Sequence, residues 1–207
     1  MLPAMTSPRT PATLLEISGA DYPPARLADG ALVLIDAQRV YVDGRLALPG
    51  IRPALAEAAR LLARARAAGT PVVHVVQHGR PGGAICDPGG ADVAVVDEVT
   101  PQPGEPVIIK SLPSGFARTT LDATLRQFGR THLIVTGFMT HMCVSSTVRA
   151  ALDLGYRCTV VAAACATRDL PDGRGGVVPA EVVHRANLAA LADRFAVVVP
   201  DAGAIPD

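Results

Sequence analysis

Runs of apolar residues alternate with helix-like patterns along most of the chain. The continuous apolar runs are residues 31–36, 71–77, 107–110, 132–136, 157–161 and 195–199. Runs of this kind are typical of strands buried on both faces of a parallel sheet. Apolar positions at helical spacing lie between them, at about residues 53–68, 119–128, 140–155 and 179–193. This alternation predicts one layered α/β sandwich, with helices on both faces of a parallel sheet.

Three segments depart from this alternation. Residues 1–28 are rich in proline and show no sustained periodicity, so we expect an N-terminal tail or arm before a domain spanning residues 29–207. Such an arm would lie over the domain or reach a neighbouring subunit. Residues 78–106 form a long connection, whose glycine-rich part, 79–90, is a candidate lid or a disordered stretch. We expect a further loop over residues 162–178.

The composition excludes several classes of protein. The 207 residues are 49% hydrophobic, which is enough for one large core. Lys+Arg and Asp+Glu both number 19 and aromatic residues make up 3%, so neither a basic surface nor a base-stacking platform for nucleic acid is expected. No apolar run approaches the ~20 residues of a membrane helix, and the chain does not begin with a signal-peptide pattern. We expect a soluble, cytoplasmic protein that binds a small molecule and neither nucleic acid nor membrane.

Three chemically active residues lie at the carboxyl ends of predicted strands. Asp36 ends the first strand, Lys110 ends the third, and Cys143 follows the fourth. In parallel sheets, ligands bind at this edge. Each residue alone has a simpler interpretation: a turn-capping Asp, a solvated strand-end Lys and a small buried Cys. Their coincidence at one edge favours a catalytic site.

The predicted surroundings of these residues suggest nucleophilic chemistry. Thr140 is expected to cap a helix that begins at His141, which places Cys143 in its first turn. The free amides and the helix dipole there would favour a thiolate and could bind an oxyanion. Burial would raise the pKa of Asp36, so that it could take the thiol proton and return it to a leaving amine. Lys110 would orient Asp36 and add positive potential near the sulfur.

Three segments resemble the signature segments of isochorismatase-like cysteine hydrolases. They are residues 33–38 (VLIDAQ), 107–116 (VIIKSLPSGF) and 135–150 (VTGFMTHMCVSSTVRA). They occur in the order of that family, the loop 166–169 is also similar, and the resemblance covers roughly residues 29–200. It implies a Rossmann-like, six-stranded parallel sheet in the order 3-2-1-4-5-6, and a homodimer or homotetramer.

The resemblance also implies roles for individual residues. Asp36 would be the general base and acid, Lys110 its partner, and Cys143 the residue that carries a covalent acyl intermediate. A cis peptide bond is implied between Phe138 and Met139. This bond would direct the Met139 amide into an oxyanion hole that it shares with the Cys143 amide.

The sequence departs from the metal-binding members of the family. Nicotinamidases share a D-x-H motif after the second strand, where this chain reads Gln77-His78-Gly79-Arg80 and lacks the Asp. His74 and His78 would share one face of an extended strand, which could suit a metal. A buried strand His74 and a pocket-rim His78 are the favoured interpretation. We therefore predict no metal and no cofactor, and nicotinamide is disfavoured as a substrate.

Further residues are candidates for a substrate pocket. They are Gln38, His78, Phe116, Phe138 and His141. Phe116 fits a pocket wall and a core contact equally well. His141 lies beside the nucleophile and fits a structural role slightly better than substrate contact.

The favoured function is hydrolysis of a C–N bond in a small amide, lactam or carbamoyl compound through an acyl-enzyme on Cys143. Within the family, the alternative is vinyl-ether cleavage of isochorismate, which does not need the cysteine and would favour convergent Arg or Lys residues. Outside it, the alternatives are a non-catalytic binding protein and a thiol redox protein, for which Cys165 is the plausible resolving cysteine. The absence of G-x-G-x-x-G after the first strand argues against NAD binding.

Overall fold

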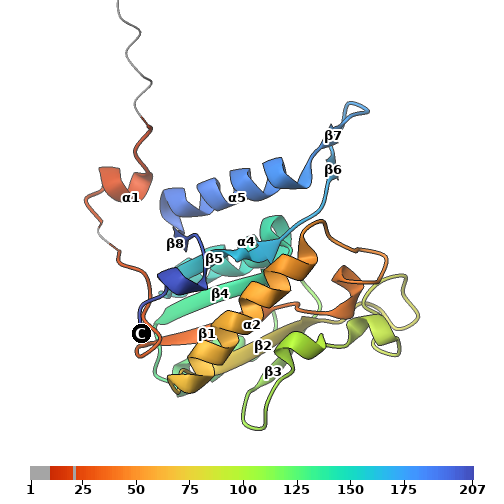
Figure 1. Cartoon of the computed structure of the whole chain (residues 1–207), viewed down its shortest axis with the longest axis horizontal. Helices are drawn as coiled ribbons and strands as arrows, with labels where there is room; N and C mark the ends of the chain where they lie inside the picture. The colour runs from red at the N-terminus through yellow and green to blue at the C-terminus, as the bar shows by residue number, and fades with distance from the viewer. Residues whose placement is uncertain (1–9, 21) are drawn as a thin grey trace, which may run out of the picture.

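The computed structural model describes residues 10–20 and 22–207, so residues 1–9 and 21 of the expected N-terminal arm lie outside the described residues. A parallel sheet of six strands in the order β3-β2-β1-β4-β5-β8 forms the centre of the molecule (Figure 1). The strands are β1 (Gly30–Ile35), β2 (Val72–Gln77), β3 (Val107–Lys110), β4 (His132–Phe138), β5 (Arg157–Ala166) and β8 (Ala196–Val199). Because β8 is the sixth strand of this sheet along the chain, the expected order 3-2-1-4-5-6 is confirmed.

Helices cover both faces of the sheet and complete the three layers. Helix α2 (Ile51–Ala67) packs on one face, while α3 (Leu121–Gln127), α4 (Ser145–Asp153) and α5 (Ala180–Arg194) pack on the other. Side chains of a strand alternate between its faces, so Leu32 and Leu34 of β1 join the core under α2, and Val33 joins the opposite core. No helix within the described part of the chain is long and apolar enough to cross a membrane.

The expected loop over residues 162–178 contains regular structure. Strand β5 continues to Ala166, and β6 (Leu170–Pro171) pairs with β7 (Val177–Val178) in an antiparallel hairpin. The extension of β5 is held by long-range pairing, in which Gly137 of β4 lies opposite Cys165. Its sequence is rich in alanine, which has little preference for strands, so the local pattern gave no sign of it.

Part of the expected N-terminal arm packs on the domain. Residues 10–20 include the short helix α1 (Leu14–Ile17), which begins with a capping box between Thr13 and Glu16. The Leu14 amide donates a hydrogen bond of 2.9 Å to the Asp193 carboxylate of α5, and Leu15 is buried.

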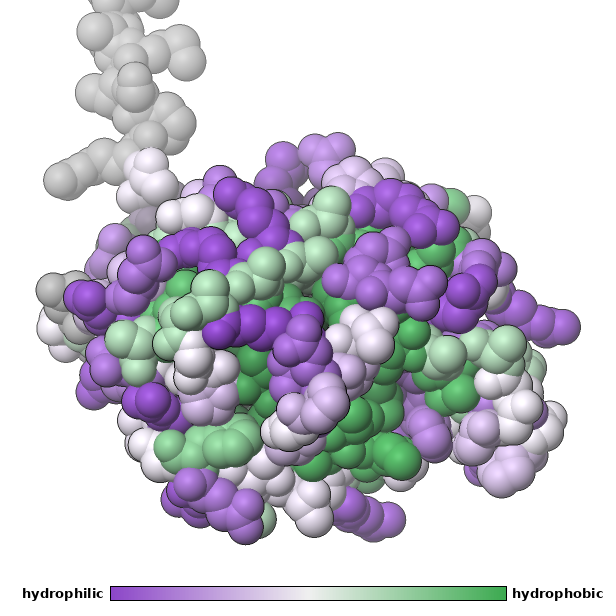
Figure 2. Space-filling view, turned by 60° about the horizontal axis from the view of Figure 1, so that its bottom comes forward, coloured by the Kyte–Doolittle hydropathy of each residue, from purple (hydrophilic) through white to green (hydrophobic). Residues whose placement is uncertain are grey.

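The edge strand β3 leaves apolar side chains in contact with solvent. Val107 and Ile109 are 46% and 56% exposed. The face of the molecule seen in Figure 2 carries hydrophobic surface between hydrophilic side chains. Exposed apolar surface is typical of contacts between proteins, and the homodimer or homotetramer expected from the resemblance stays a prediction.

Candidate active site

Asp36, Lys110 and Cys143 come together at the carboxyl edge of the sheet. The Lys110 ammonium nitrogen lies 2.8 Å from Asp36 Oδ2 and 3.2 Å from the sulfur of Cys143. The three residues are 0%, 1% and 5% exposed, respectively. A carboxylate, an ammonium and a thiol therefore share one site that is almost closed to water.

The strand ends hold Asp36 and Lys110 in place. The Asp36 amide continues the sheet by donating to Val75 O at 2.7 Å, and its φ of 52° then turns the chain away from β1. Lys110 ends the edge strand β3 opposite Gln77, whose Oε1 accepts a hydrogen bond of 2.6 Å from the Lys110 ammonium. Because Lys110 is buried and fully engaged, the interpretation as a solvated strand-end lysine is wrong.

The chain enters the Cys143 segment differently from the prediction. Thr140–Val144 form a π-helical turn, and α4 begins only at Ser145. The expected cap by Thr140 is wrong, because its hydroxyl instead contacts Ala166 O at 3.1 Å and His184 Nδ1 at 2.9 Å. Single π-turns are frequent at functional sites.

The peptide bond that precedes this turn agrees with the resemblance. The bond between Phe138 and Met139 is cis, as expected. Met139 and Cys143 both lie at the wall of the cavity described below.

Electrostatics keep the Cys143 thiol protonated. Burial raises the pKa of Cys143 to about 12; the negative charge of Asp36 acts in the same direction, and Lys110 opposes it. The expectation of a thiolate stabilised by a helix N-terminus is therefore wrong, since desolvation and Asp36 dominate. Burial also raises the pKa of Asp36, as the sequence predicted, although the charge and hydrogen bond of Lys110 limit this effect.

A cavity of about 270 Å³ opens onto the sulfur of Cys143. Its wall consists of Tyr41, Leu46, Gln77, Gly79, Ile85, Cys86, Ser111, Leu112, Pro113, Met139, Met142 and Cys143. Gly79, Ile85 and Cys86 belong to the candidate lid, so this segment does lie against the cavity. It is held by hydrogen bonds from the Gly79 amide to Cys86 O at 2.7 Å and from the Cys86 amide to the Asp92 carboxylate at 3.0 Å.

The predicted pocket residues lie around this cavity rather than in its wall. Gln38 is fully buried, and its side-chain amide donates to Gln77 O at 3.0 Å and to Val93 O at 2.7 Å. It therefore fastens the long connection 78–106 to the sheet. His78 is half-buried, and its backbone amide donates to Lys110 O at 2.9 Å.

The aromatic candidates have packing roles. Phe116 stacks on Tyr156 with ring centres 5.6 Å apart, which makes it a core contact and not a pocket wall. Phe138 is buried against Tyr41, with ring centres 6.1 Å apart. His141 Nδ1 contacts the Thr167 hydroxyl, which agrees with the structural role favoured for it.

Sequence reasoning missed most of the cavity wall. Leu112 lies within the segment 107–116, two residues after Lys110, and could have been found there, but Tyr41 and Met142 lie on segments about a hundred residues apart in the chain. For the thiol redox alternative, the structure changes which cysteine could act as the resolving residue. Cys165 is buried away from the cavity wall, whereas Cys86 lines it beside Cys143.

The histidines considered as metal ligands have other surroundings. His74 Nε2 lies 2.9 Å from Glu105 Oε2, and Arg66 contacts the same carboxylate at 2.7 and 2.8 Å. Within residues 10–20 and 22–207, no group of three or more His, Cys, Asp or Glu side chains is placed to hold a metal ion.

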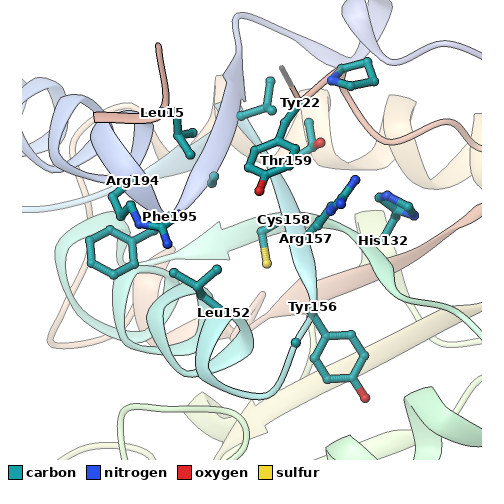
Figure 3. A pocket seen from close by; sticks show the side chains of 14 residues that line it. Leu15, Tyr22, His132, Leu152, Tyr156, Arg157, Cys158, Thr159, Arg194 and Phe195 are labelled. Atoms are coloured by element: carbon teal, nitrogen blue, oxygen red, sulfur yellow. The ribbon is translucent and has the colours of Figure 1, made fainter. Parts of the chain in front are cut away.

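A second hollow, of about 220 Å³, lies at the opposite end of the strands (Figure 3). Tyr22 and Arg157 stack in it, with the guanidinium 4.6 Å from the ring centre. Its cysteine, Cys158, is fully buried, and burial raises its pKa to about 12 without a carboxylate or lysine to modulate it. This hollow therefore lacks the carboxylate and ammonium groups that surround Cys143.

The isochorismatase domain model matches residues 30–202 of the chain. The chain is 39% identical over 176 residues to a secreted isochorismatase effector of Verticillium dahliae, covering 84% of this chain and 90% of that protein. It is 34% identical over 192 residues to a ureidoacrylate amidohydrolase of Variovorax paradoxus, covering 71% and 76%. A crystal structure of an isochorismatase from Pseudomonas putida is 44% identical and superposes with a TM-score of 0.90, covering 95% of this chain and 100% of that one. With a matching family model, relatives of this similarity and the same fold, the chain belongs to the isochorismatase family and is a hydrolase.

Proposed function

We propose that this hydrolase cleaves a C–N bond in a small amide, lactam or carbamoyl compound, with Cys143 as the nucleophile. The observation that supports this proposal most directly is the buried Lys110 ammonium. It contacts both Asp36 Oδ2 (2.8 Å) and Cys143 Sγ (3.2 Å) beside an open cavity. The similarity to an amidohydrolase supports amide chemistry.

The first step transfers a proton and forms a covalent bond. Asp36 takes the Cys143 proton as the sulfur attacks the substrate carbonyl carbon. Burial raises the pKa of Asp36, which makes it a stronger base than an exposed carboxylate, and Lys110 stabilises the thiolate as it forms. In this proposal the backbone N–H groups of Met139 and Cys143 bind the oxyanion of the tetrahedral intermediate.

The second half of the reaction returns the proton and restores the enzyme. The protonated Asp36 gives its proton to the leaving nitrogen, the C–N bond breaks, and a thioester remains on Cys143. Asp36 then removes a proton from water as the water oxygen attacks the thioester. The C–S bond breaks, the thiol is reprotonated, and the acid product leaves, so that amide and water have become acid and amine.

The acyl-enzyme is the species to test. The protein is mixed with p-nitrophenyl hexanoate, an activated acyl donor that needs no protonation of its leaving group, and its cysteine peptides are analysed by mass spectrometry. We expect a hexanoyl adduct on the Cys143 peptide and none on the Cys158 or Cys165 peptides. A panel of amides, lactams and ureides then follows acid or ammonia release.

Two variants control this experiment. Cys143→Ser should lose at least about 100-fold in acyl transfer, because a buried serine hydroxyl is a far weaker nucleophile than the thiol. Cys158→Ser, at the opposite end of the sheet, should retain activity. Unchanged p-nitrophenol release in Cys143→Ser would contradict the proposed function.

A further inference from the structure

We propose that the cavity beside Cys143 takes an uncharged, mainly apolar acyl compound, and that the Tyr41 hydroxyl holds a polar atom of it. This inference rests on the proposed function, because it concerns the substrate of the same site.

Among the residues that the structure describes, no charged side chain belongs to the cavity wall. None of its wall residues is Asp, Glu, Lys, Arg or His. Lys110 contacts the wall residue Cys143 but is not itself part of the wall. The Lys110 ammonium lies 2.8 Å from Asp36 Oδ2, 2.6 Å from Gln77 Oε1 and 3.2 Å from Cys143 Sγ, so its charge is already paired with Asp36 and is not free for a substrate carboxylate. An anionic group in this cavity would lose its water without gaining a cation, which is strongly unfavourable.

The mouth of the cavity offers apolar surface instead. Ile85, Leu112 and Met142 are 42%, 39% and 38% exposed, and all three belong to the wall. Leu46 adds a further aliphatic side chain. A bound apolar group would remove these side chains from water, which is favourable in proportion to the area covered.

Tyr41 provides the polar contact. It is 3% exposed, and its ring is held against Phe138. Its hydroxyl makes no hydrogen bond to any residue of the described chain, although it belongs to the cavity wall. Burial and the nearby charge of Asp36 raise the pKa of Tyr41, so the phenol is a neutral donor at physiological pH. A neutral phenol in the wall of the cavity can donate a hydrogen bond to an oxygen of the substrate.

The substrate class therefore differs from that named for one relative. Ureidoacrylate, named in the Variovorax paradoxus amidohydrolase, is a carboxylate. Among the described residues, the wall of this cavity contains no Lys or Arg to bind such a group, and Lys110 is paired with Asp36.

Two esters of equal acyl length test the charge preference. p-Nitrophenyl hexanoate ends in a methyl group, and mono-p-nitrophenyl adipate ends in a carboxylate. After subtraction of the uncatalysed rates, we expect kcat/KM for the hexanoate to exceed that for the adipate by at least tenfold. Leu112→Lys, at the exposed mouth, should raise the adipate rate several-fold, whereas Leu112→Gln, which is polar but uncharged, should not.

The outcomes separate the two proposals. Acylation of Cys143 by neither ester would contradict the proposed function itself. Acylation by both esters with equal kcat/KM would be consistent with that function but would overturn the proposal that the cavity takes an uncharged substrate.

Tyr41→Phe tests the proposed hydrogen bond between the Tyr41 hydroxyl and the substrate. Loss of one neutral hydrogen bond should raise KM for p-nitrophenyl hexanoate about 3- to 10-fold with a smaller effect on kcat. The matched control is Tyr22→Phe in the distant hollow, which should leave both constants unchanged. An unchanged KM in Tyr41→Phe would overturn the role of Tyr41.

Discussion

The Lys110 ammonium lies 2.8 Å from Asp36 Oδ2, and both side chains are 0% exposed. The pair joins the ends of β1 and β3, two strands that do not touch each other because β2 lies between them. Two opposite charges buried together compensate one another, while either charge alone would be very costly. The Lys110 ammonium also lies 3.2 Å from the Cys143 sulfur, so in the proposed mechanism the pair governs the proton of that thiol.

Asp36→Asn should separate thiol acidity from catalysis. Burial and the Asp36 charge both raise the pKa of Cys143, so removing the charge should lower that pKa from about 12. The same variant has no base for the thiol proton and no acid for the leaving amine, so kcat should fall by about 100-fold or more. The pH dependence of thiolate ultraviolet absorbance measures the first effect, and amide hydrolysis measures the second.

The reverse result would be informative. A Cys143 pKa that rises in Asp36→Asn would show that Asp36 stabilises the thiolate and does not oppose it. Cys143→Ser in the same Asp36→Asn background should be measured alongside and subtracted, because the thiolates of Cys86, Cys158 and Cys165 otherwise add to the absorbance at high pH.

Lys110→Met should destabilise the protein in a pH-dependent manner. Without the ammonium, the buried Asp36 carboxylate is unpaired, which costs about 3–5 kcal/mol of unfolding free energy. Burial already raises the folded pKa of Asp36, and loss of Lys110 raises it further. The folded state then holds the proton more tightly than the unfolded chain does. The stability of the variant is therefore highest at low pH and declines as pH rises from the unfolded toward the folded pKa.

Urea unfolding at pH 5 and pH 8 measures this effect. The double variant Lys110→Met with Asp36→Asn should recover much of the loss and should show little of the added pH dependence. If the double variant is as unstable as Lys110→Met alone, lost packing of the lysine stem is responsible and not the unpaired charge.

Glu105→Gln should weaken the fold above pH 4.5. The hydrogen bonds of Arg66 are the main cause that lowers the pKa of Glu105 to about 2, and His74 and the Gln102 amide contribute. A carboxyl group whose pKa is lower in the folded protein than in the unfolded chain stabilises the folded state at pH values above its unfolded pKa. This contribution is lost as the pH falls toward 2. The contribution is on the order of 2–3 kcal/mol at pH 7.

Thermal unfolding at several pH values tests this prediction. The difference between wild type and Glu105→Gln should shrink as pH falls from 4.5 toward 2. Glu98→Gln is the matched control, because its ion pair with Arg52 is exposed and such pairs contribute about 0–1 kcal/mol. Equal losses of unfolding free energy in the two variants would contradict a stabilising role for the contacts of Glu105 with Arg66 and His74.

Gly137→Ala should prevent β1 and β4 from pairing. A Cβ at this position would lie 1.9 Å from Ile35 O, and φ is +128°. Neither backbone can move without breaking the centre of the sheet, so the loss should exceed about 3 kcal/mol. Gly129→Ala is the control, since φ is +65° there but nothing lies within 4 Å of a Cβ, and it should lose only about 1 kcal/mol. Similar unfolding midpoints for the two variants would show that the close approach of Gly137 to Ile35 does not exclude a larger side chain.

The strands of the sheet could be predicted because their signal is local. The six apolar runs correspond to β1, β2, β3, β4, β5 and β8 within a few residues at their ends, except that β5 extends to Ala166. That extension depends on pairing of Cys165 with Gly137 of β4, which no local pattern contains. The hairpin of β6 and β7 is likewise too short to produce a periodic signal.

The sequence by itself determined which residues could react and at which edge they would lie. Asp36, Lys110 and Cys143 each follow a strand, and parallel strands place their carboxyl ends at one edge of the sheet. Only the tertiary structure decided the state of these groups. The raised pKa of Cys143, the close contacts of Lys110 with Asp36, Gln77 and Cys143, and the apolar cavity wall depend on burial and on residues far apart in the chain. Desolvation and long-range contacts are properties of the packed molecule, and a local pattern of residues does not contain them.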